Sequence, residues 1–322
     1  MFQTTRRAAL GAALVAAGRA HAQAWPSRPI TWIVPFTPGG ITDTSSRLVA
    51  QPLGAWLGQQ VVIDNRPGAG GSIGTEAGAR AAADGYTILY GTQGTLATNP
   101  VLYRNVRYDP LRDFAPVHGL AQTPLLVVVN PARPFRTLAE LIGHARERPG
   151  ELTFATSGIG TGTHMAAELF QAEAGVKLTQ VPYQGSAPAL NDLVAGRTDV
   201  MFDYLVSTRA FLDAGRLRPI ATTAGARLAA LPEVPTMAEA GLPGAETSSW
   251  SCILAPAAVP APIRARLADG LQAALSEPRV VQTLAGSGST PLMLAGEALQ
   301  DFVTREVERW RGIVERSGAR AG

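Results

Sequence analysis

Apolar and polar positions follow the same order four times along the chain: a short apolar run, a glycine-rich turn and a stretch with helical spacing. Short apolar runs that alternate with helical stretches predict strands connected by helices. The four runs begin at Ile30, Val61, Leu152 and Leu178. The pattern predicts an α/β fold with mostly parallel sheets that helices cover on both faces.

The glycine-rich turns have a consequence for chemistry. A glycine turn at the start of a helix leaves backbone N–H groups without partners and directs the positive end of the helix dipole outward. Such a helix start binds anions without a basic side chain. The four units form two pairs, so we expect two similar lobes that each present two helix starts to a shared cleft.

Two continuous apolar runs, residues 125–129 and 250–254, bracket the second pair of units. A single doubly wound sheet fits the pattern, but we interpret these runs as segments that cross between lobes. We therefore expect two lobes, with two sheets joined by two crossover strands. Lobe 1 is expected to contain residues 25–123 and 252–322, and lobe 2 residues 124–251, with closure at the hinge.

Helix signals are clear at several positions. Thr137 followed by Glu140 predicts a capping box before a helix that starts at Leu138. We also expect helices over about 42–57 and 72–83, a short helix that ends at Gly241, and a helical tail from residue 262.

The first 24 residues have the composition of a signal peptide. Arg6 and Arg7 precede an apolar stretch, residues 8–17, that is too short to span a bilayer, and A-x-A cleavage sites follow at residues 20–24. We expect cleavage near residues 22–24 and export to the periplasm. An uncleaved anchor is the alternative, and the two arginines leave the general and the twin-arginine export routes open.

Charge and cysteine content exclude several classes of protein. The chain has 28 basic and 25 acidic residues, and three of the basic ones, Arg6, Arg7 and Arg19, lie in the leader. The remainder is therefore neutral and lacks the basic patches of a nucleic-acid-binding protein. The single cysteine, Cys252, rules out an internal disulfide and lies in an apolar run, which favours a buried, inert thiol.

The first glycine turn, Pro38-Gly39-Gly40, either binds a carboxylate through its N–H groups or is only a tight turn. Asp43 follows it and would repel an anion. We therefore favour a capping or turn role for Asp43, with contact to a ligand ammonium group as the alternative.

The second turn contains a G-x-S-x-G match centred on Ser72. This pattern occurs at the nucleophile of α/β-hydrolases, where the strand runs straight into the serine. Here Arg66, Pro67 and Gly68 intervene, and none of the histidines follows in the expected order. A secreted serine hydrolase that uses Ser72 is therefore an unfavoured alternative.

In lobe 2, Ser157 and Thr163 belong to a glycine-rich loop with neutral donors suited to a carboxylate, and His164 opens the next helix as a cap, a packed ring or a ligand contact. Asp203 ends an apolar strand and is a ligand contact or a helix cap. The sequence lacks the HExxH, paired-cysteine and clustered-histidine patterns of metal sites.

Taken together, the ordered segments resemble the Bug (TctC) family, the extracytoplasmic solute-binding proteins of tripartite tricarboxylate transporters. Asp43 and Arg47 follow the first of these segments. The segments are WPSRPITWIVPFTPGG, LGQQVVIDNRPGAGGSIGT, ADGYTIL, YDPLRDFAPV, LAELIGHARERPGELTFATSGIGTGTHMAAELF, VPYQGSAPALNDLVAGRTDVMFD and LPEVPTMAEAGLPG.

The resemblance implies a two-lobed periplasmic binding protein of the Venus-flytrap type, with no catalytic residues, cofactor or metal. Such a protein holds a small carboxylate through backbone amides, hydroxyls and water. The chain departs from the usual pattern at residues 159–162, which leaves the ligand open. The implied contacts are Phe36, Gly39, Gly40, Gly70, Gly71, Thr92, Ser157, Gly158, Thr163, Tyr183, Gly185, Ser186, Ala187 and Asp203.

We therefore predict a periplasmic solute-binding protein, monomeric by default, that captures a carboxylate-bearing ligand for membrane permease subunits. A receptor that reports its ligand to a two-component sensor kinase is the alternative within the same fold.

Overall fold

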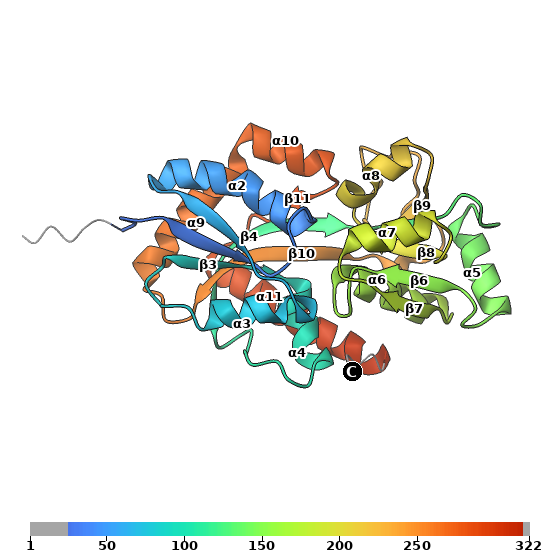
Figure 1. Cartoon of the computed structure of the whole chain (residues 1–322), viewed down its shortest axis with the longest axis horizontal. Helices are drawn as coiled ribbons and strands as arrows, with labels where there is room; N and C mark the ends of the chain where they lie inside the picture. The colour runs from blue at the N-terminus through green and yellow to red at the C-terminus, as the bar shows by residue number, and fades with distance from the viewer. Residues whose placement is uncertain (1–24, 318–322) are drawn as a thin grey trace, which may run out of the picture.

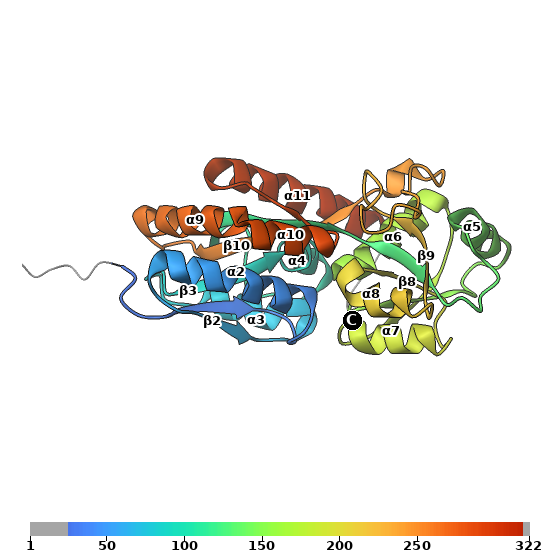
Figure 2. The same cartoon turned by 90° about the horizontal axis from the view of Figure 1, so that it is seen from above.

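The computed structural model describes residues 25–317, which form two α/β lobes side by side along the long axis (Figures 1 and 2). The predicted signal peptide lies outside the described residues. The strand order is β11-β4-β10-β3-β1-β2 in lobe 1 and β7-β6-β8-β5-β9 in lobe 2.

The strands of lobe 1 are β1 (Ile30–Val34), β2 (Val61–Asn65), β3 (Thr87–Thr92), β4 (Phe114–Pro124), β10 (Ser248–Pro256) and β11 (Thr290–Pro291). Its helices are α2 (Ile41–Leu57), α3 (Ser72–Ala79), α4 (Asn99–Leu102), α9 (Ala261–Ser276), α10 (Pro278–Gly286) and α11 (Gly296–Ser317), with short helical turns η2 (Ala69–Gly71) and η3 (Gly94–Thr98).

Lobe 2 has strands β5 (Leu126–Val129), β6 (Thr153–Thr156), β7 (Thr179–Pro182), β8 (Val200–Asp203) and β9 (Arg218–Thr222). Its helices are α5 (Leu138–Glu147), α6 (Gly162–Ala174), α7 (Ser186–Val194) and α8 (Leu205–Asp213), followed by the turn η4 (Pro243–Ala245).

Both sheets are mixed, which corrects the expectation of mostly parallel sheets. The strands of the glycine units pair in parallel, as β1 does with β2 and β3, and β6 with β7 and β8. The strands next to the lobe boundary run antiparallel: β10 pairs with β3 and β4, and β5 with β8 and β9. β5 carries the chain into lobe 2 and β10 carries it back into lobe 1. Each of these strands runs antiparallel to the strands of the glycine units in its sheet.

The two crossings lie at the ends of the predicted apolar runs. β4 continues into β5 through Leu125, and the chain returns between Thr223 and β10. Leu125 and Thr223 hold the crossings together: the Thr223 amide donates to the Leu125 carbonyl at 2.8 Å, and the Leu125 amide donates to the Thr223 hydroxyl oxygen at 2.8 Å. The predicted division into domains stays a prediction, and its second cut falls within β10.

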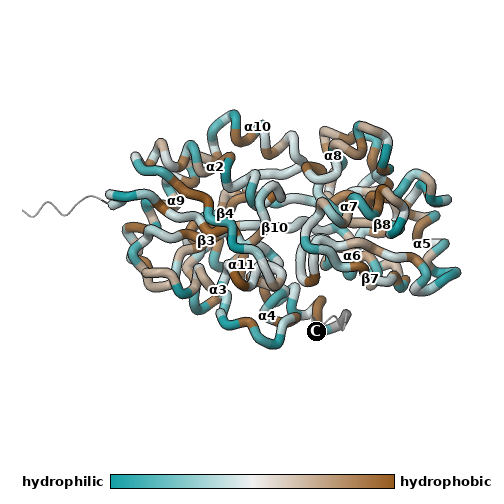
Figure 3. The backbone as a smooth tube through the Cα atoms, in the orientation of Figure 1, coloured by the Kyte–Doolittle hydropathy of each residue, from teal (hydrophilic) through white to brown (hydrophobic). Residues whose placement is uncertain are grey.

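Each sheet has apolar side chains on both faces, because helices cover both. On β1, Trp32 belongs to the apolar cluster that includes side chains of α2 and α9, whereas Ile33, on the opposite face, belongs to the cluster that includes side chains of α11. In lobe 2, Val127 faces α5 and α6, and Val128 faces α7 and α8. Strongly hydrophobic segments lie inside lobe 1 near β3, and hydrophilic segments lie on outer loops such as that beside α4 (Figure 3). This layering leaves the ends of the strands to form the boundary between the lobes.

Local signals gave mixed outcomes. The capping box is confirmed, since the Glu140 amide donates to the Thr137 hydroxyl oxygen and the Glu140 carboxylate accepts from the Thr137 amide. The short helix predicted to end at Gly241 is wrong, because that segment folds as turns fixed by Thr236 and Glu239. Over residues 25–317, no helix has the length and apolar character needed to cross a membrane.

We expect Thr137→Ala to lower the free energy of unfolding by about 1 kcal/mol, because the first turn of α5 loses its cap. Urea denaturation measures the change. Thr304→Ala is the control: Thr304 bonds the Gln300 carbonyl inside α11, and alanine is a better helix former there. Equal losses in both variants would contradict the capping role.

Candidate functional site

A cavity of about 440 Å³ lies between the lobes. Lobe 1 contributes residues 36–42, Tyr90, Thr92 and Gly94, and lobe 2 contributes Ser157, Thr161, Gly162, residues 184–188, Leu190, Tyr204 and Ser207. Thr123, Ser249, Trp250 and Ser251 close the side next to the crossings. Within the described chain, none of the residues that line this cavity has a charged side chain. A ligand here meets hydroxyls, backbone groups and apolar surface.

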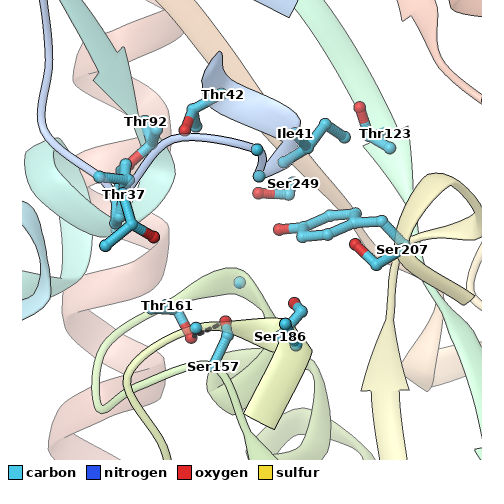
Figure 4. Close-up of a pocket in the computed structure, with 18 of the residues that line it drawn as sticks. Thr37, Ile41, Thr42, Thr92, Thr123, Ser157, Thr161, Ser186, Ser207 and Ser249 are labelled. Atoms are coloured by element: carbon cyan, nitrogen blue, oxygen red, sulfur yellow. Dashed lines mark hydrogen bonds between the residues drawn. The ribbon is translucent and has the colours of Figure 1, made fainter. Parts of the chain in front are cut away.

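Polar side chains of the two lobes face each other across this space. Figure 4 shows Thr37 and Thr92 on the lobe 1 wall, with Ser157, Thr161 and Ser186 opposite them on lobe 2. In the same view Ser249 of β10 lies to the right of Thr37, and Thr123 of β4 lies farther right, beyond Ile41. A small ligand can therefore bond both lobes at once.

The lobe 1 wall is shaped by the turn before α2. Gly39 has a φ of 84°, a conformation that favours glycine, and its amide donates to Asp43 Oδ2 at 2.9 Å. Arg47 forms an ion pair with the same carboxylate at 2.9 Å. Burial raises the pKa of Asp43, but the hydrogen bonds from Arg47, the Gly39 amide and Asn65 outweigh it, and the net pKa is lowered. Asp43 therefore stabilises the turn, and Arg47 neutralises its charge. This arrangement supports the turn role expected from the sequence.

The end of β3 forms a second rigid corner. Thr92 and Thr95 bond reciprocally, because each backbone amide donates to the other's hydroxyl oxygen, at 3.0 and 3.1 Å. The Tyr108 hydroxyl donates to the Thr95 carbonyl, and burial raises the pKa of Tyr108, so it stays a neutral donor. This corner holds Thr92 and Gly94 at the cavity surface.

In lobe 2, three hydroxyls cluster after β6. The Thr161 hydroxyl donates to the Gly158 carbonyl at 2.7 Å, and Thr163 Oγ1 accepts from the Ser157 amide at 2.9 Å. The Ser157 and Thr163 hydroxyl oxygens lie 2.9 Å apart. The Ser157 hydroxyl donates to Thr161 Oγ1 at 3.2 Å, so a ligand that accepts a hydrogen bond from Ser157 must compete with this bond.

His164 stabilises the same loop. Its Nδ1 accepts from the Gly160 amide at 3.1 Å, its ring stacks on Phe154, and its Nε2 lies 3.5 Å from Glu168. His164 is almost fully buried and is not among the cavity residues. It acts here as a packed ring that holds the loop, one of the alternatives that the sequence left open.

The start of α7 has two free amides and one unusual acid. Gly185 has a φ of 116°, and Ser186 and Ala187, the first two residues of α7, line the cavity. Their N–H groups have no partner within the helix. Behind them, Asp203 Oδ1 accepts from the Ser186 hydroxyl at 3.0 Å and from the Tyr204 amide at 2.8 Å.

Asp203 is completely buried, and its Oδ2 has no hydrogen-bond partner among the described residues. Burial raises the pKa of Asp203 to about 7, even though the Tyr204 amide and the Ser186 hydroxyl favour the charged form. The two acids next to the cavity therefore differ: Asp43 is paired with a cation and Asp203 is not.

The lobes also touch away from the crossings. The Thr98 hydroxyl donates to the Gly160 carbonyl at 2.7 Å, and the Tyr103 hydroxyl donates to the Ile159 carbonyl at 3.1 Å. Both carbonyls belong to the loop that carries Ser157 and Thr161. Residues 159–162, where the sequence departs from the usual pattern, thus form the contact that holds this loop against lobe 1.

Eight of the predicted site residues line the cavity: Phe36, Gly39, Gly40, Thr92, Ser157, Gly185, Ser186 and Ala187. They come from both lobes, as expected from helix starts that face a shared cleft. The Gly39 amide, however, is already bonded to Asp43, so a ligand would have to compete for it.

The other six predicted residues, Gly70, Gly71, Gly158, Thr163, Tyr183 and Asp203, do not line it. Gly70 packs against Tyr103 and the Ile159 carbonyl, and Gly71 against Thr95 and Phe36. The Tyr183 hydroxyl bonds Asp192 at 2.7 Å. The Gly158 carbonyl and Thr163 Oγ1 accept hydrogen bonds within the hydroxyl cluster, and Asp203 accepts one from Ser186. Each of these residues has a partner within the protein.

The sequence missed the aromatic and crossing-strand wall, which includes Tyr90, Thr123, Tyr204, Ser249 and Trp250. Trp250 is fixed from behind, because its indole N–H donates to Glu306 of α11 at 2.8 Å, and Glu306 also accepts from Trp310 at 3.1 Å. The sequence held a usable signal for Thr123, Ser249 and Trp250, which stand at the starts of the predicted crossing runs, but none for Tyr90 and Tyr204.

A family model described as "Tripartite tricarboxylate transporter family receptor" (TctC) matches residues 45–319. The chain belongs to the TctC family. Protein BugT of Bordetella pertussis is 37% identical to this TctC receptor, over 99% of each chain.

Two solved structures are similar to this TctC receptor. R. palustris Rpa4515 with adipate has 41% identity and a TM-score of 0.86, covering 91% of this chain and 98% of its own. MatC from Rhodopseudomonas palustris with bound malate has 34% identity and a TM-score of 0.83, covering 90% and 100%. The two-lobed fold is thus that of periplasmic binding proteins.

We expect Thr98→Val to shift this TctC receptor toward an open form, because the buried Gly160 carbonyl loses its donor from lobe 1 and regains one from water on opening. Small-angle X-ray scattering of the ligand-free protein measures the change as a larger radius of gyration. Thr75→Val is the matched control, since the buried Thr75 hydroxyl donates to the Gly71 carbonyl of its own lobe. An unchanged radius in Thr98→Val would contradict the role of this contact.

Proposed function

We propose that this TctC receptor binds a small carboxylate-bearing solute in the cavity between its lobes and delivers it to the membrane subunits of a tripartite transporter. It works in the periplasm as a monomer and without catalysis, after cleavage of the leader near residues 22–24. The family and its carboxylate-bound structural neighbours support the ligand class.

The start of α7 carries this proposal. Ser186 and Ala187 line the cavity, and their free amides at the positive end of the helix dipole suit one carboxylate group. Ser157 on lobe 2 and Gly40 and Thr92 on lobe 1 line the same space. A ligand bonded to both walls stabilises the closed arrangement of the lobes.

The affinity required is within reach of this site. A hydrogen bond to a charged group contributes roughly 1.5–3 kcal/mol, and micromolar binding needs about 8 kcal/mol. Amides and hydroxyls from two lobes are sufficient, so a basic side chain is not needed. The aromatic wall of Tyr90, Tyr204 and Trp250 adds contact with the apolar part of the ligand.

The alternatives have less support. Ser72 is buried, and its hydroxyl oxygen accepts from the Asn99 amide at 3.1 Å, an arrangement that supports a structural role over that of a nucleophile. The family's association with tripartite transporters favours delivery to permease subunits over signalling to a sensor kinase.

A thermal-shift panel tests the ligand class. We expect adipate, malate or a related carboxylate to raise the melting temperature by a few degrees, since a ligand at a hundredfold excess over its Kd adds about 2.7 kcal/mol. Adipamide, in which neutral amides replace the carboxylates, is the matched control and should give a smaller shift. A panel in which carboxylates and their amides behave alike would argue against a carboxylate site.

The role of the α7 amides can be isolated at one residue. Ser186→Ala removes only the hydroxyl, whereas Ser186→Pro also removes the N–H at the first helical position, where proline is tolerated. We expect the proline variant to bind adipate roughly 10- to 100-fold more weakly than the alanine variant, as measured by calorimetry. Equal affinities would show that the carboxylate lies elsewhere.

A further inference from the structure

Asp203 lies directly behind the helix start where the proposed function places an anion. Its carboxyl group is one hydroxyl away from the cavity, because Ser186 both lines the cavity and donates to Asp203 Oδ1. A carboxylate held by the amides of Ser186 and Ala187 would therefore lie close to a second carboxyl group. Two carboxyl groups that share a site shielded from water do not both remain ionised.

The surroundings of Asp203 provide no compensating cation. In lobe 1, Arg47 neutralises Asp43 at 2.9 Å, but among the described residues no ion pair reaches Asp203. Strands β5 and β6, which flank β8 in the sheet, have no titratable side chain.

The titratable groups on the neighbouring helices either have hydrogen-bond or ion-pair partners of their own or are exposed. On α6, His164 bonds the Gly160 amide and faces Glu168, and Glu173 is exposed. On α7, Asp192 pairs with Arg197, and on α8, Arg209 pairs with Asp213.

The two phenols at the cavity and the acid at the other end of β8 do not change this balance. Burial raises the pKa of both Tyr90 and Tyr204, so these groups stay neutral. Asp199 is paired with Arg133 at 2.7 Å. Within residues 25–317, Asp203 is left as an acid without a counter-ion.

The structure also shows where a proton would reside. Oδ1 already accepts two hydrogen bonds, from Ser186 and Tyr204, whereas Oδ2 has none among the residues described. A proton on Oδ2 removes the buried charge and leaves both bonds to Oδ1 in place. The neutral acid is therefore compatible with the observed geometry without any rearrangement.

We propose that this receptor takes up its ligand's carboxylate together with one proton, which resides on Oδ2 of Asp203 behind the start of α7. This inference rests on the proposed carboxylate site. Asp203 is thereby a positioning residue: it acts through Ser186 and makes the capture of an anion electrically neutral at this end of the cavity.

The direction of the pH dependence follows. Because burial places the pKa of Asp203 at about 7 in the free receptor, the acid is already protonated below pH 7 and affinity is constant there. Above pH 7 the free receptor has lost this proton and must regain it on binding. Affinity therefore falls by about tenfold for each further pH unit, until the pKa of the bound form is reached.

Calorimetry with adipate tests the proposal. Wild-type receptor is titrated between pH 6.0 and 8.5, in phosphate and in Tris, whose ionisation enthalpies differ. We expect uptake of up to one proton per adipate at pH 8, weaker binding at pH 8.5 than at pH 6.0, and constant affinity below pH 7. Binding without proton uptake, or affinity that rises with pH as it would for an ammonium group at Asp203, overturns the proposal.

Two variants test whether the proton resides on Asp203. Asp203→Asn mimics the neutral acid and should give a flat pH profile, no proton uptake and tighter binding than wild type at pH 8.5. Asp192→Asn is the control, since Asp192 pairs with Arg197 and its pKa is lowered, and it should keep the wild-type profile. If Asp203→Asn bound adipate with the wild-type pH dependence, the proton would not reside on Asp203.

A measurement without ligand separates this inference from the proposed function. In ¹³C NMR of aspartate-labelled free receptor, one carboxyl group should titrate near pH 7 and be absent in Asp203→Asn. If that variant does not fold, the wild-type count of carboxyl groups that titrate above pH 6 still decides. A receptor that binds no carboxylate contradicts the proposed function, whereas aspartates that are all ionised by pH 5 contradict the proton on Asp203.

Discussion

The first turn of a helix has backbone N–H groups that the helix cannot satisfy, and the proposed binding site of this receptor depends on that constraint. The turns before α2 and α7 bring such groups to the cavity at Gly40, Ser186 and Ala187. Local hydrogen bonds fix the other walls of the cavity. The Thr92–Thr95 corner, the hydroxyl cluster after β6 and the His164 ring all bond loop backbone or loop hydroxyls.

The same arrangement explains how charge is handled. Under the proposed function, a cavity without charged side chains selects anions through oriented dipoles, and so its selectivity depends on geometry. The acids next to the two helix starts differ in their surroundings. Asp43 stabilises its turn and forms an ion pair with Arg47, whereas Asp203 is buried and has no ion pair among the described residues. In a site of neutral polar groups, a single unpaired carboxyl group nearby has a large effect on ligand binding, because no other charge screens its field.

Much of this could be predicted from the sequence, because it depends on local patterns. The glycine units, the Thr137 cap and the two lobes follow from spacing within short segments. The mixed direction of the sheets could not be predicted, because the sense of β5 and β10 depends on partners that are distant in the chain. The position of Gly70 depends on how one lobe packs on the other, and that of Gly71 on packing within lobe 1. The unbonded Oδ2 of Asp203 depends on which neighbouring groups lack hydrogen-bond donors.

The position of β10 has a consequence for how the chain assembles. This strand lies in the middle of the lobe 1 sheet, where Ser251 pairs with Thr92 on one side and Ala121 on the other. Until it arrives, β3 and β4 each lack a neighbour, whereas lobe 2 is built from one continuous segment. All strands of lobe 2 therefore precede the last third of the chain's helices, whereas the lobe 1 sheet is completed only when β10 and β11 join the first part of the chain. A cavity with walls in both lobes then forms at the final step, so a truncated chain has no binding site to present.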